Sequence, residues 1–212
     1  MDKELYEYLV LPDYEKASNL ILALLENIRT DDRREEARTG IAHIDNIEHR
    51  LKSFDSFSKK CVDKGIDQDD LGEIRNLIKD IAGVRITCRT KKDCYDIAKK
   101  IKHLPTVSID REKDYLSNPK PNGYSGIHLN TTVSIYDSEE GTKNVPVEVQ
   151  IRTMSFNIWA STEHFRYDGH KISDEYTTDA ETNRLFQKLS EVLSEADDIV
   201  SAILERNQKP AD

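Results

Sequence analysis

Strict alternation of apolar and polar residues in the second half of the chain is the feature that most limits its fold. Between Val145 and Arg152, a valine or isoleucine occupies every second position, and most positions between them are polar. Residues 126–136 alternate in the same way, and a polar turn at residues 137–141 separates the two segments. A period of two is typical of strands with one buried face, so we predict a β-hairpin.

Apolar residues recur at helical spacing on both sides of this hairpin, and shorter alternating segments precede it. Helices are predicted over Tyr14–Ile28, Arg33–Lys52, Leu71–Ile81, Thr90–Lys102 and Thr153–Phe165, with a last helix that contains residues 185–204. Asp69 or Asp70 should cap the third of these helices. Strands are predicted over Val84–Arg89 and Val107–Ile109. Gly83 should end the helix before the first strand, and Thr90 with Asp93 should form a capping box.

This order of elements predicts an α+β fold. We expect a central mixed β-sheet of about five strands, flanked by N-terminal helices over residues 13–52 and a C-terminal helix over residues 179–207. A chain of 212 residues is long enough for one ordinary domain, so we expect residues 1–212 to form a single domain.

The composition is that of a charged globular chain, with 37% hydrophobic residues, 33% charged residues and a formal net charge of −9. This charge opposes sequence-independent binding to nucleic acids, which depends on neutralising many phosphates. No apolar stretch is long enough to span a bilayer and no secretory signal is visible, so we expect a cytoplasmic protein without a membrane partner. A phosphorylated substrate would therefore require a local basic pocket.

The polar face of the predicted hairpin carries the first candidate functional residues. Glu148, Gln150 and Arg152 share one side of their strand, and Tyr124 and His128 fall on the same side of the neighbouring strand. Such a face is often only the solvent-exposed side of an antiparallel sheet. An acid, an amide, a base and aromatic groups on adjacent strands also suit a binding site, and both interpretations are open at this point.

A second carboxylate, Asp80, is predicted at the end of the helix that precedes the strand Val84–Arg89. Asp80 and Glu148 are candidates to share one Mg²⁺, because this cation favours one or two carboxylates together with substrate phosphates. Whether the two carboxylates meet depends on how the strands pair.

Basic residues concentrate before Asp80, in a run that contains Arg50, Lys52, Lys59, Lys60 and Lys64. Neither a P-loop nor a glycine-rich dinucleotide fingerprint is present. A basic run is often only a solvated face, although arginine can also stack on a purine ring. The loop Lys113–Tyr124, with two prolines and an Asn-Gly pair, is predicted to lack regular structure and to allow a close backbone approach to a ligand.

Several groups of residues occur in an order that resembles one known family. They are Arg50-x-Lys52-Ser53-x-x-Ser56, Asp80-Ile-Ala-Gly-Val-Arg85, Lys113-Asp-Tyr, Asn118-Pro-Lys-Pro-Asn-Gly-Tyr124-x-x-x-His128 and Glu148-Val-Gln150-Ile-Arg152-Thr. Together they resemble the synthetase domain of the RelA/SpoT family. The following Phe156-x-x-Trp159-Ala-Ser-x-Glu163-His164 resembles the single-domain members, the small alarmone synthetases. The resemblance covers Tyr14–Glu205 and implies the nucleotidyltransferase-like synthetase fold.

The resemblance implies an ATP-dependent diphosphotransferase of the GTP diphosphokinase class, which moves the β,γ-diphosphate of ATP to a ribose 3′-hydroxyl and releases AMP. It implies that Asp80 and Glu148 bind Mg²⁺ and that Glu148 also activates the attacking hydroxyl. The residues implied to bind ATP are Arg50 and Arg85, which would sandwich the adenine, and Lys52, Ser56, Lys60 and Lys113. The residues implied to bind the acceptor are Tyr124, which would stack on its base, and Asn122, His128 and Gln150.

The identity of the acceptor is open. With GTP or GDP the product is (p)ppGpp, a stringent-response signal, whereas the toxic branch of the family modifies the 3′ CCA end of tRNA and is restrained by a protein antitoxin. Ser125 stands where the family commonly has Arg or Gln, which makes the acceptor pocket less basic. A protein that only binds nucleotides is a third interpretation, which the presence of both Asp80 and Glu148 disfavours. A homo-oligomer is compatible with the resemblance, because small synthetases often form tetramers.

Overall fold

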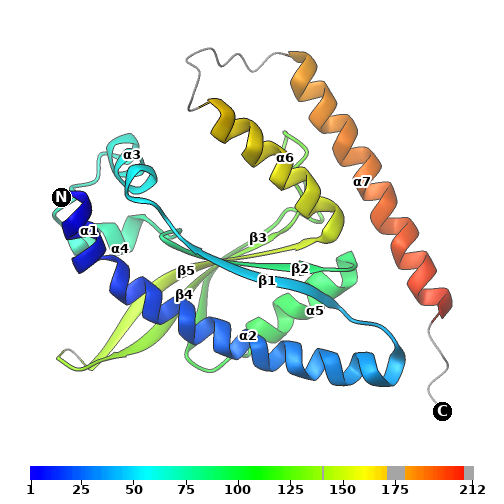
Figure 1. The fold of residues 1–212 in the computed structure, drawn as a ribbon, viewed down its shortest axis with the longest axis horizontal. Helices are drawn as coiled ribbons and strands as arrows, with labels where there is room; N and C mark the ends of the chain where they lie inside the picture. Colours follow the sequence, from blue (N-terminus) through cyan, green and yellow to red (C-terminus); the bar gives the residue numbers. More distant parts are fainter. Residues whose placement is uncertain (140, 171–179, 208–212) are drawn as a thin grey trace.

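The computed structural model describes residues 1–139, 141–170 and 180–207, with the backbone alone for residues 165–170 and 207. The helices are α1 Lys3–Leu9, α2 Leu11–Thr39, α3 Phe54–Lys64, α4 Leu71–Leu77, α5 Lys91–Ile101, α6 Met154–His170 and α7 Ala180–Asn207. The strands are β1 Ile44–Leu51, β2 Ala82–Cys88, β3 Val107–Asp114, β4 Ile127–Asp137 and β5 Gly141–Thr153. This is the predicted α+β class (Figure 1). Residue 179, the predicted start of the C-terminal helical flank, lies outside the described residues.

The strands form one five-stranded mixed sheet in the order β1-β2-β5-β4-β3. Strands β2 and β5 are parallel, and the other neighbouring pairs are antiparallel. The predicted hairpin is confirmed, because β4 and β5 pair in register from Ile127 opposite Ile151 to Asp137 opposite Gly141. The last strand in the sequence, β5, therefore lies at the centre of the sheet.

Helices α2 and α5 cover one face of the sheet (Figure 1). Buried residues of these helices, such as Ile21 and Ile97, pack in one core with inward side chains of the strands, among them Val84, Val149 and Ile151. Burial of this apolar surface is the dominant favourable contribution to folding. The opposite face of the sheet carries its polar side chains, with α3 above one end and α6 above the other (Figure 1).

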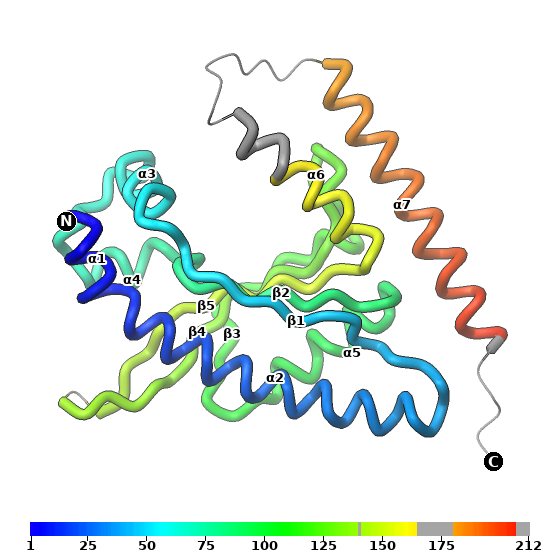
Figure 2. The backbone as a smooth tube through the Cα atoms, in the orientation of Figure 1, coloured from blue at the N-terminus to red at the C-terminus, as the bar shows by residue number. Residues whose placement is uncertain are grey.

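A second, aromatic cluster attaches the C-terminal helices beside this polar face. It contains Tyr124, Phe156, Trp159, Phe186 and Leu193. Helices α6 and α7 pack side by side, and the loop between β3 and β4 rises next to α6 (Figure 2). Among the described residues, no helix combines the length and the apolar character needed to cross a membrane.

Local helix signals are confirmed at α4 and α5. The Asp70 carboxylate accepts a hydrogen bond from the Glu73 backbone amide at 2.9 Å. Thr90 and Asp93 form the predicted capping box at the start of α5. Each cap satisfies backbone N–H groups that have no partner within the helix.

The N-terminal helices begin and end earlier than predicted, at Lys3 and Thr39, and the helix predicted over Arg33–Lys52 is wrong beyond Thr39. Helix α2 runs without a break to Thr39, and residues 44–51 form strand β1. No glycine or proline interrupts the second half of α2 before Gly40, which ends it at φ +79°. The apolar residues of β1 also fit helical spacing, but pairing with β2 outweighs this local preference.

Two candidate residues lie in a different local structure from the one predicted. Helix α4 ends at Leu77, so Asp80 lies in the loop before β2, and Gly83 belongs to β2 instead of ending a helix. Strand β3 extends to Asp114, so Lys113 lies in a strand and not in the predicted loop. Pairing with neighbouring strands accounts for Gly83 in β2 and for the extension of β3 to Asp114.

Candidate active site

Cross-strand pairing arranges the polar face of the sheet in two neighbouring rows. The first row runs across four strands through Arg50, Gly83, Glu148 and Asn130. The second row takes one residue from every strand and runs through Glu48, Arg85, Gln150, His128 and Lys113. Directly paired residues present their side chains on the same face, so residues far apart in the sequence become neighbours.

Asp80 lies beside these rows, in the loop that precedes β2. Its Oδ2 accepts from Lys52 Nζ at 3.1 Å and from Lys60 Nζ at 2.7 Å. Burial alone would raise the pKa of the Asp80 carboxyl, but the hydrogen bond from Lys60 and the charges of both lysines outweigh it and hold the pKa below its ordinary value. Two lysines that the family resemblance implies to bind ATP therefore meet at one carboxylate.

Glu148 is held from both sides by neighbouring strand residues. His128 Nδ1 lies 3.3 Å from Glu148 Oε1, and Gln150 Nε2 donates to Glu148 Oε2 at 2.8 Å. Burial would raise the pKa of Glu148, but the hydrogen bond and charge of His128, with the bond from Gln150, outweigh it and hold the pKa below its ordinary value. Glu148 is therefore an ionised carboxylate at neutral pH.

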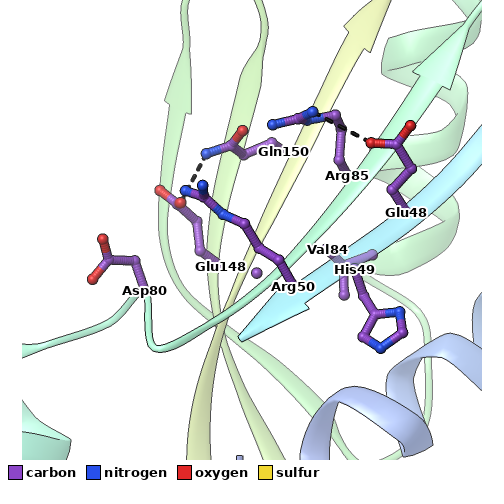
Figure 3. A pocket seen from close by; sticks show the side chains of 9 residues that line it. Glu48, His49, Arg50, Asp80, Val84, Arg85, Glu148 and Gln150 are labelled. Carbon is purple, nitrogen blue, oxygen red and sulfur yellow. Dashed lines mark hydrogen bonds and ion pairs between the residues drawn. The ribbon is translucent and has the colours of Figure 1, made fainter. Parts of the chain in front are cut away.

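A cavity of about 50 Å³, the smaller cavity, joins both carboxylates to Arg50 and Arg85 (Figure 3). Gly83 lies between Arg50 and Glu148 in the first row, and a Cβ at this position would lie 3.8 Å from Arg50 Cγ. Arg50 extends from β1 towards Glu148 (Figure 3). Arg85 is turned towards β1, where its Nη1 donates to Glu48 Oε2 at 3.3 Å.

The residues around the smaller cavity fit a bound Mg²⁺. Asp80 Oδ1 is buried without a hydrogen-bond partner, and Asp80 is close enough to Glu148 for its charge to raise the pKa of Glu148. Within the described part of the chain, no group of three or more His, Cys, Asp or Glu residues could hold a metal ion. A site with two carboxylates suits Mg²⁺, which completes its coordination with water and substrate phosphates.

Tyr124 stands at the other end of the polar face, on the loop between β3 and β4. Its hydroxyl lies 2.7 Å from His128 Nε2, and burial raises the pKa of Tyr124 to about 12. The ring makes edge contacts with His128 and Trp159, at centroid distances of 5.3 and 5.6 Å. Lys120 Nζ lies 4.7 Å from the ring centroids of both Tyr115 and Tyr124. The position of the Tyr124 ring is thus fixed by its neighbours.

A larger cavity, of about 370 Å³, adjoins Tyr124 and His128. Its size suits a small-molecule ligand. The two cavities share Arg50, Arg85 and Gln150 in their walls. A ligand in one cavity is therefore in reach of residues that line the other.

Sequence reasoning assigned no role to Lys120, Glu163 and His164, which line the larger cavity, and it placed Arg152 on the polar face without assigning it to a substrate. Arg152 is only 1% exposed, and its Nη2 donates to Gln150 Oε1 at 3.4 Å. Burial lowers the pKa of Arg152 to about 10, which leaves it cationic at neutral pH. All of these residues lie inside the motifs that carry the family resemblance, so the motifs were the signal that could have found them.

The structure brings most of the predicted site residues together, but not all. Asn122 reaches the larger cavity indirectly, because its Nδ2 donates to Glu163 Oε1 at 2.8 Å. Ser56 lies in the first turn of α3 and lines neither cavity. Lys113 also lines neither cavity, and it pairs with His128 on the side of the sheet farthest from Arg50.

Comparisons of the sequence identify relatives over the part of the chain that forms this site. Residues 49–172, which include every predicted site residue, match the family model described as a region found in RelA / SpoT proteins. GTP pyrophosphokinase YwaC of Bacillus subtilis (strain 168) is 37% identical over 124 residues, which cover 58% of this chain and 58% of YwaC. GTP pyrophosphokinase YjbM of the same strain is 29% identical over 212 residues, 95% of each chain.

The fold agrees with these matches. The crystal structure of small alarmone synthetase 1 from Bacillus subtilis, bound to its product pppGpp, has a TM-score of 0.82 and 28% sequence identity to this chain. The match covers 98% of this chain and 100% of that chain. The family model spans more than half of the sequence, and the chain belongs to the RelA/SpoT family.

Proposed function

We propose that this protein transfers the β,γ-diphosphate of ATP to the 3′-hydroxyl of GTP or GDP, giving (p)ppGpp and AMP. The observation that carries the proposal is the meeting of Asp80 and Glu148 with Arg50 and Arg85 around one cavity. Relatives named as GTP pyrophosphokinases, and a similar structure that holds pppGpp, support the same reaction.

ATP is assigned to the smaller cavity and the surface beside it. The planar guanidinium groups of Arg50 and Arg85 can stack on adenine, which a lysine ammonium does less well. Lys52 and Lys60 converge on Asp80 and place two cations where the phosphates would pass. The assignment of Ser56 and Lys113 to ATP rests on the family resemblance alone.

Asp80 and Glu148 are the residues that would hold Mg²⁺. Bound there, the ion supplies positive charge that offsets the charge on the transferred phosphates. The arginines and lysines of the site add to this field.

Glu148 is the group that takes the proton from the attacking 3′-hydroxyl. It is ionised, and its hydrogen bonds with His128 and Gln150 fix the position of both carboxylate oxygens. The 3′-oxygen forms a bond to the β-phosphorus of ATP, the bond from that phosphorus to the oxygen bridging to the α-phosphate breaks, and AMP leaves. Alignment of the two substrates accounts for much of the rate in such a transfer.

The acceptor is assigned to the larger cavity, where Tyr124 would stack on its base. Ser125, which departs from the family pattern, is 2% exposed and lines neither cavity. Lys120 and Arg152 contribute cations to the wall of the larger cavity. This weakens the sequence argument for tRNA as the acceptor.

The proposal is tested by incubating the protein with γ-labelled ATP and Mg²⁺, together with GDP, GTP or deacylated tRNA in parallel. We expect label in the product of GDP or GTP, and no label with the Glu148→Gln variant. Label on tRNA alone would overturn the choice of acceptor. Label on none of the three would overturn diphosphate transfer and favour a protein that only binds nucleotides.

A further inference from the structure

The acceptor loop, which we define as residues 115–126, rests on the C-terminal helix α7. Ser190 Oγ donates to the Gly123 carbonyl oxygen at 2.7 Å, and Gln187 Nε2 donates to the Pro121 carbonyl oxygen at 3.3 Å. Residues three apart lie on the same face of a helix, so one face of α7 makes both contacts. Because both acceptors are backbone carbonyls, these bonds fix the course of the main chain itself.

The approach between the acceptor loop and α7 is close enough to require glycine. A Cβ on Gly123 would lie 2.9 Å from Ser190 Cβ and 3.3 Å from the Phe186 carbonyl oxygen. Gly123 also has φ +90°, a conformation that residues with a side chain rarely adopt. The loop can therefore pack on α7 at this distance only with glycine at position 123.

The ring of Tyr124, the next residue, is also supported by α7 through one intermediate side chain. Trp159 makes an edge contact with Tyr124, and its Nε1 donates to the Phe186 carbonyl oxygen at 3.2 Å. The Trp159 and Phe186 rings are 5.3 Å apart, and Trp159 is fully buried. Both the backbone before Tyr124 and the ring itself thus depend on α7.

The smaller cavity has no comparable dependence on α7. Its lining residues belong to β1, β2, β5 and the loop that holds Asp80. A change on the loop-facing side of α7 can therefore move Tyr124 without moving the residues assigned to ATP.

We infer that helix α7 is part of the acceptor site and that Ser190 is a positioning residue for the acceptor base, acting through the Gly123 backbone on Tyr124. The inference deepens the proposed function and rests on it, because it takes Tyr124 as the residue on which the acceptor base stacks. It predicts that Ser190 affects the affinity for the acceptor and leaves the affinity for ATP unchanged.

Ser194 provides a matched control on the same helix, one turn further on. Its Oγ accepts from Lys91 Nζ of α5 at 3.1 Å, and it is not hydrogen-bonded to the acceptor loop.

We expect Ser190→Ala to raise the KM for GDP roughly 2- to 10-fold, the range for one lost hydrogen bond. The KM for ATP and the kcat at saturating substrates should not change, and Ser194→Ala should leave both KM values unchanged. An equal rise in both KM values, or the same effect from Ser194→Ala, would overturn the inference.

Hydrogen exchange tests the same contact without turnover. The acceptor loop contains backbone hydrogen bonds from the Gly123 amide to the Lys120 carbonyl at 2.8 Å and from the Lys120 amide to the Tyr124 carbonyl at 2.9 Å. Ser190→Ala should speed exchange of these two amides, and Ser194→Ala should not. Unchanged exchange in Ser190→Ala would overturn the role of Ser190. The two proposals can fail separately. If the wild-type protein transfers no label to GDP, the proposed function is contradicted, and the exchange rates still decide whether Ser190 holds the loop.

Discussion

The two ends of the candidate active site are held in place by different kinds of structure. At the end assigned to ATP, Arg50, Arg85 and Glu148 lie on paired strands, and two lysines bind Asp80. At the acceptor end, Tyr124 lies on a loop that aromatic packing and hydrogen bonds connect to α6 and α7. Strand pairing and charge fix the first end, whereas helix packing fixes the second. Substitutions should therefore affect the two substrates separately, except where one residue serves both.

Glu148 is the residue at which the two ends meet, and its replacement should have the largest effect. We expect Glu148→Gln to lower kcat by roughly 10²- to 10⁴-fold, the usual range for loss of a general base. The amide keeps the shape of the side chain, so the thermal unfolding midpoint should change little. Glu112→Gln, on β3 outside both cavities, is the control. Unchanged turnover in Glu148→Gln would remove Glu148 from its role.

Tyr124→Ala should damage the acceptor end alone. Loss of a stacking ring costs about 1–3 kcal/mol, so the KM for GDP should rise roughly 5- to 150-fold while the KM for ATP stays the same. Tyr136→Ala is the control, because Tyr136 lies on β4, lines neither cavity and is 78% exposed. Steady-state kinetics with each substrate varied in turn gives both values. Equal loss for the two substrates would contradict the division between the ends.

Lys60→Ala should have the opposite selectivity. Lys60 makes a charge-assisted hydrogen bond at Asp80, where the ATP phosphates are proposed to pass. Its removal should raise the KM for ATP about 10-fold and change the KM for GDP little. The neighbouring residue on α3 provides the control, since Lys59 is exposed and Lys59→Ala leaves Asp80 and its lysines intact. If Lys60→Ala instead weakened GDP binding, the assignment of the smaller cavity to ATP would be wrong.

The smallest expected effect concerns Asp197, which connects α7 to the end of β5. Thr153 Oγ1 donates to Asp197 Oδ2 at 2.8 Å, and burial raises the pKa of Asp197 above its ordinary value of about 3.9. A carboxyl whose pKa is raised in the folded state stabilises the fold fully at pH values below its pKa in the unfolded chain. This stabilisation is lost as the pH rises through the raised pKa of the folded state. In the wild type, the free energy of unfolding should therefore decrease as the pH rises from the ordinary pKa of an aspartate through the raised pKa of Asp197.

Urea unfolding over the same pH range checks this expectation. Asp197→Asn should remove the decline that belongs to this carboxyl, because an amide does not titrate there. Asp198→Asn, at the exposed neighbouring position, should retain it. Identical pH dependence in the wild type and Asp197→Asn would contradict the expectation.

The sequence predicted the centre of the fold better than its edges. Strict alternation identified β4 and β5, because one face of β4 and one face of β5 from Val145 onward are buried. The edge strand β1 was mistaken for helix, because its few buried residues also fit a helical period and only pairing with β2 reveals the strand. The start of β2 was missed for the same reason, since its pairing begins at Ala82 and its alternation only at Val84.

The site was predictable as a set of residues but not as a set of contacts. Motif order singled out Asp80 and Glu148, and the structure places both around one cavity. The convergence of Lys52 and Lys60 on Asp80 depends on how α3 lies relative to the loop before β2, which no local pattern encodes. The dependence of the acceptor loop on α7 joins segments more than sixty residues apart, and a sequence period cannot reveal it.

The central position of β5 has a consequence for folding during synthesis. Until residues 141–153 leave the ribosome, β1 with β2 and β3 with β4 can form only two separate pairs, each with an unpaired edge facing the gap that β5 fills. Entry of β5 closes the sheet and delivers Glu148 and Gln150 in the same step. A nascent chain that stops before β5 therefore exposes two edges prone to aggregation and lacks Glu148, the carboxylate proposed to activate the acceptor.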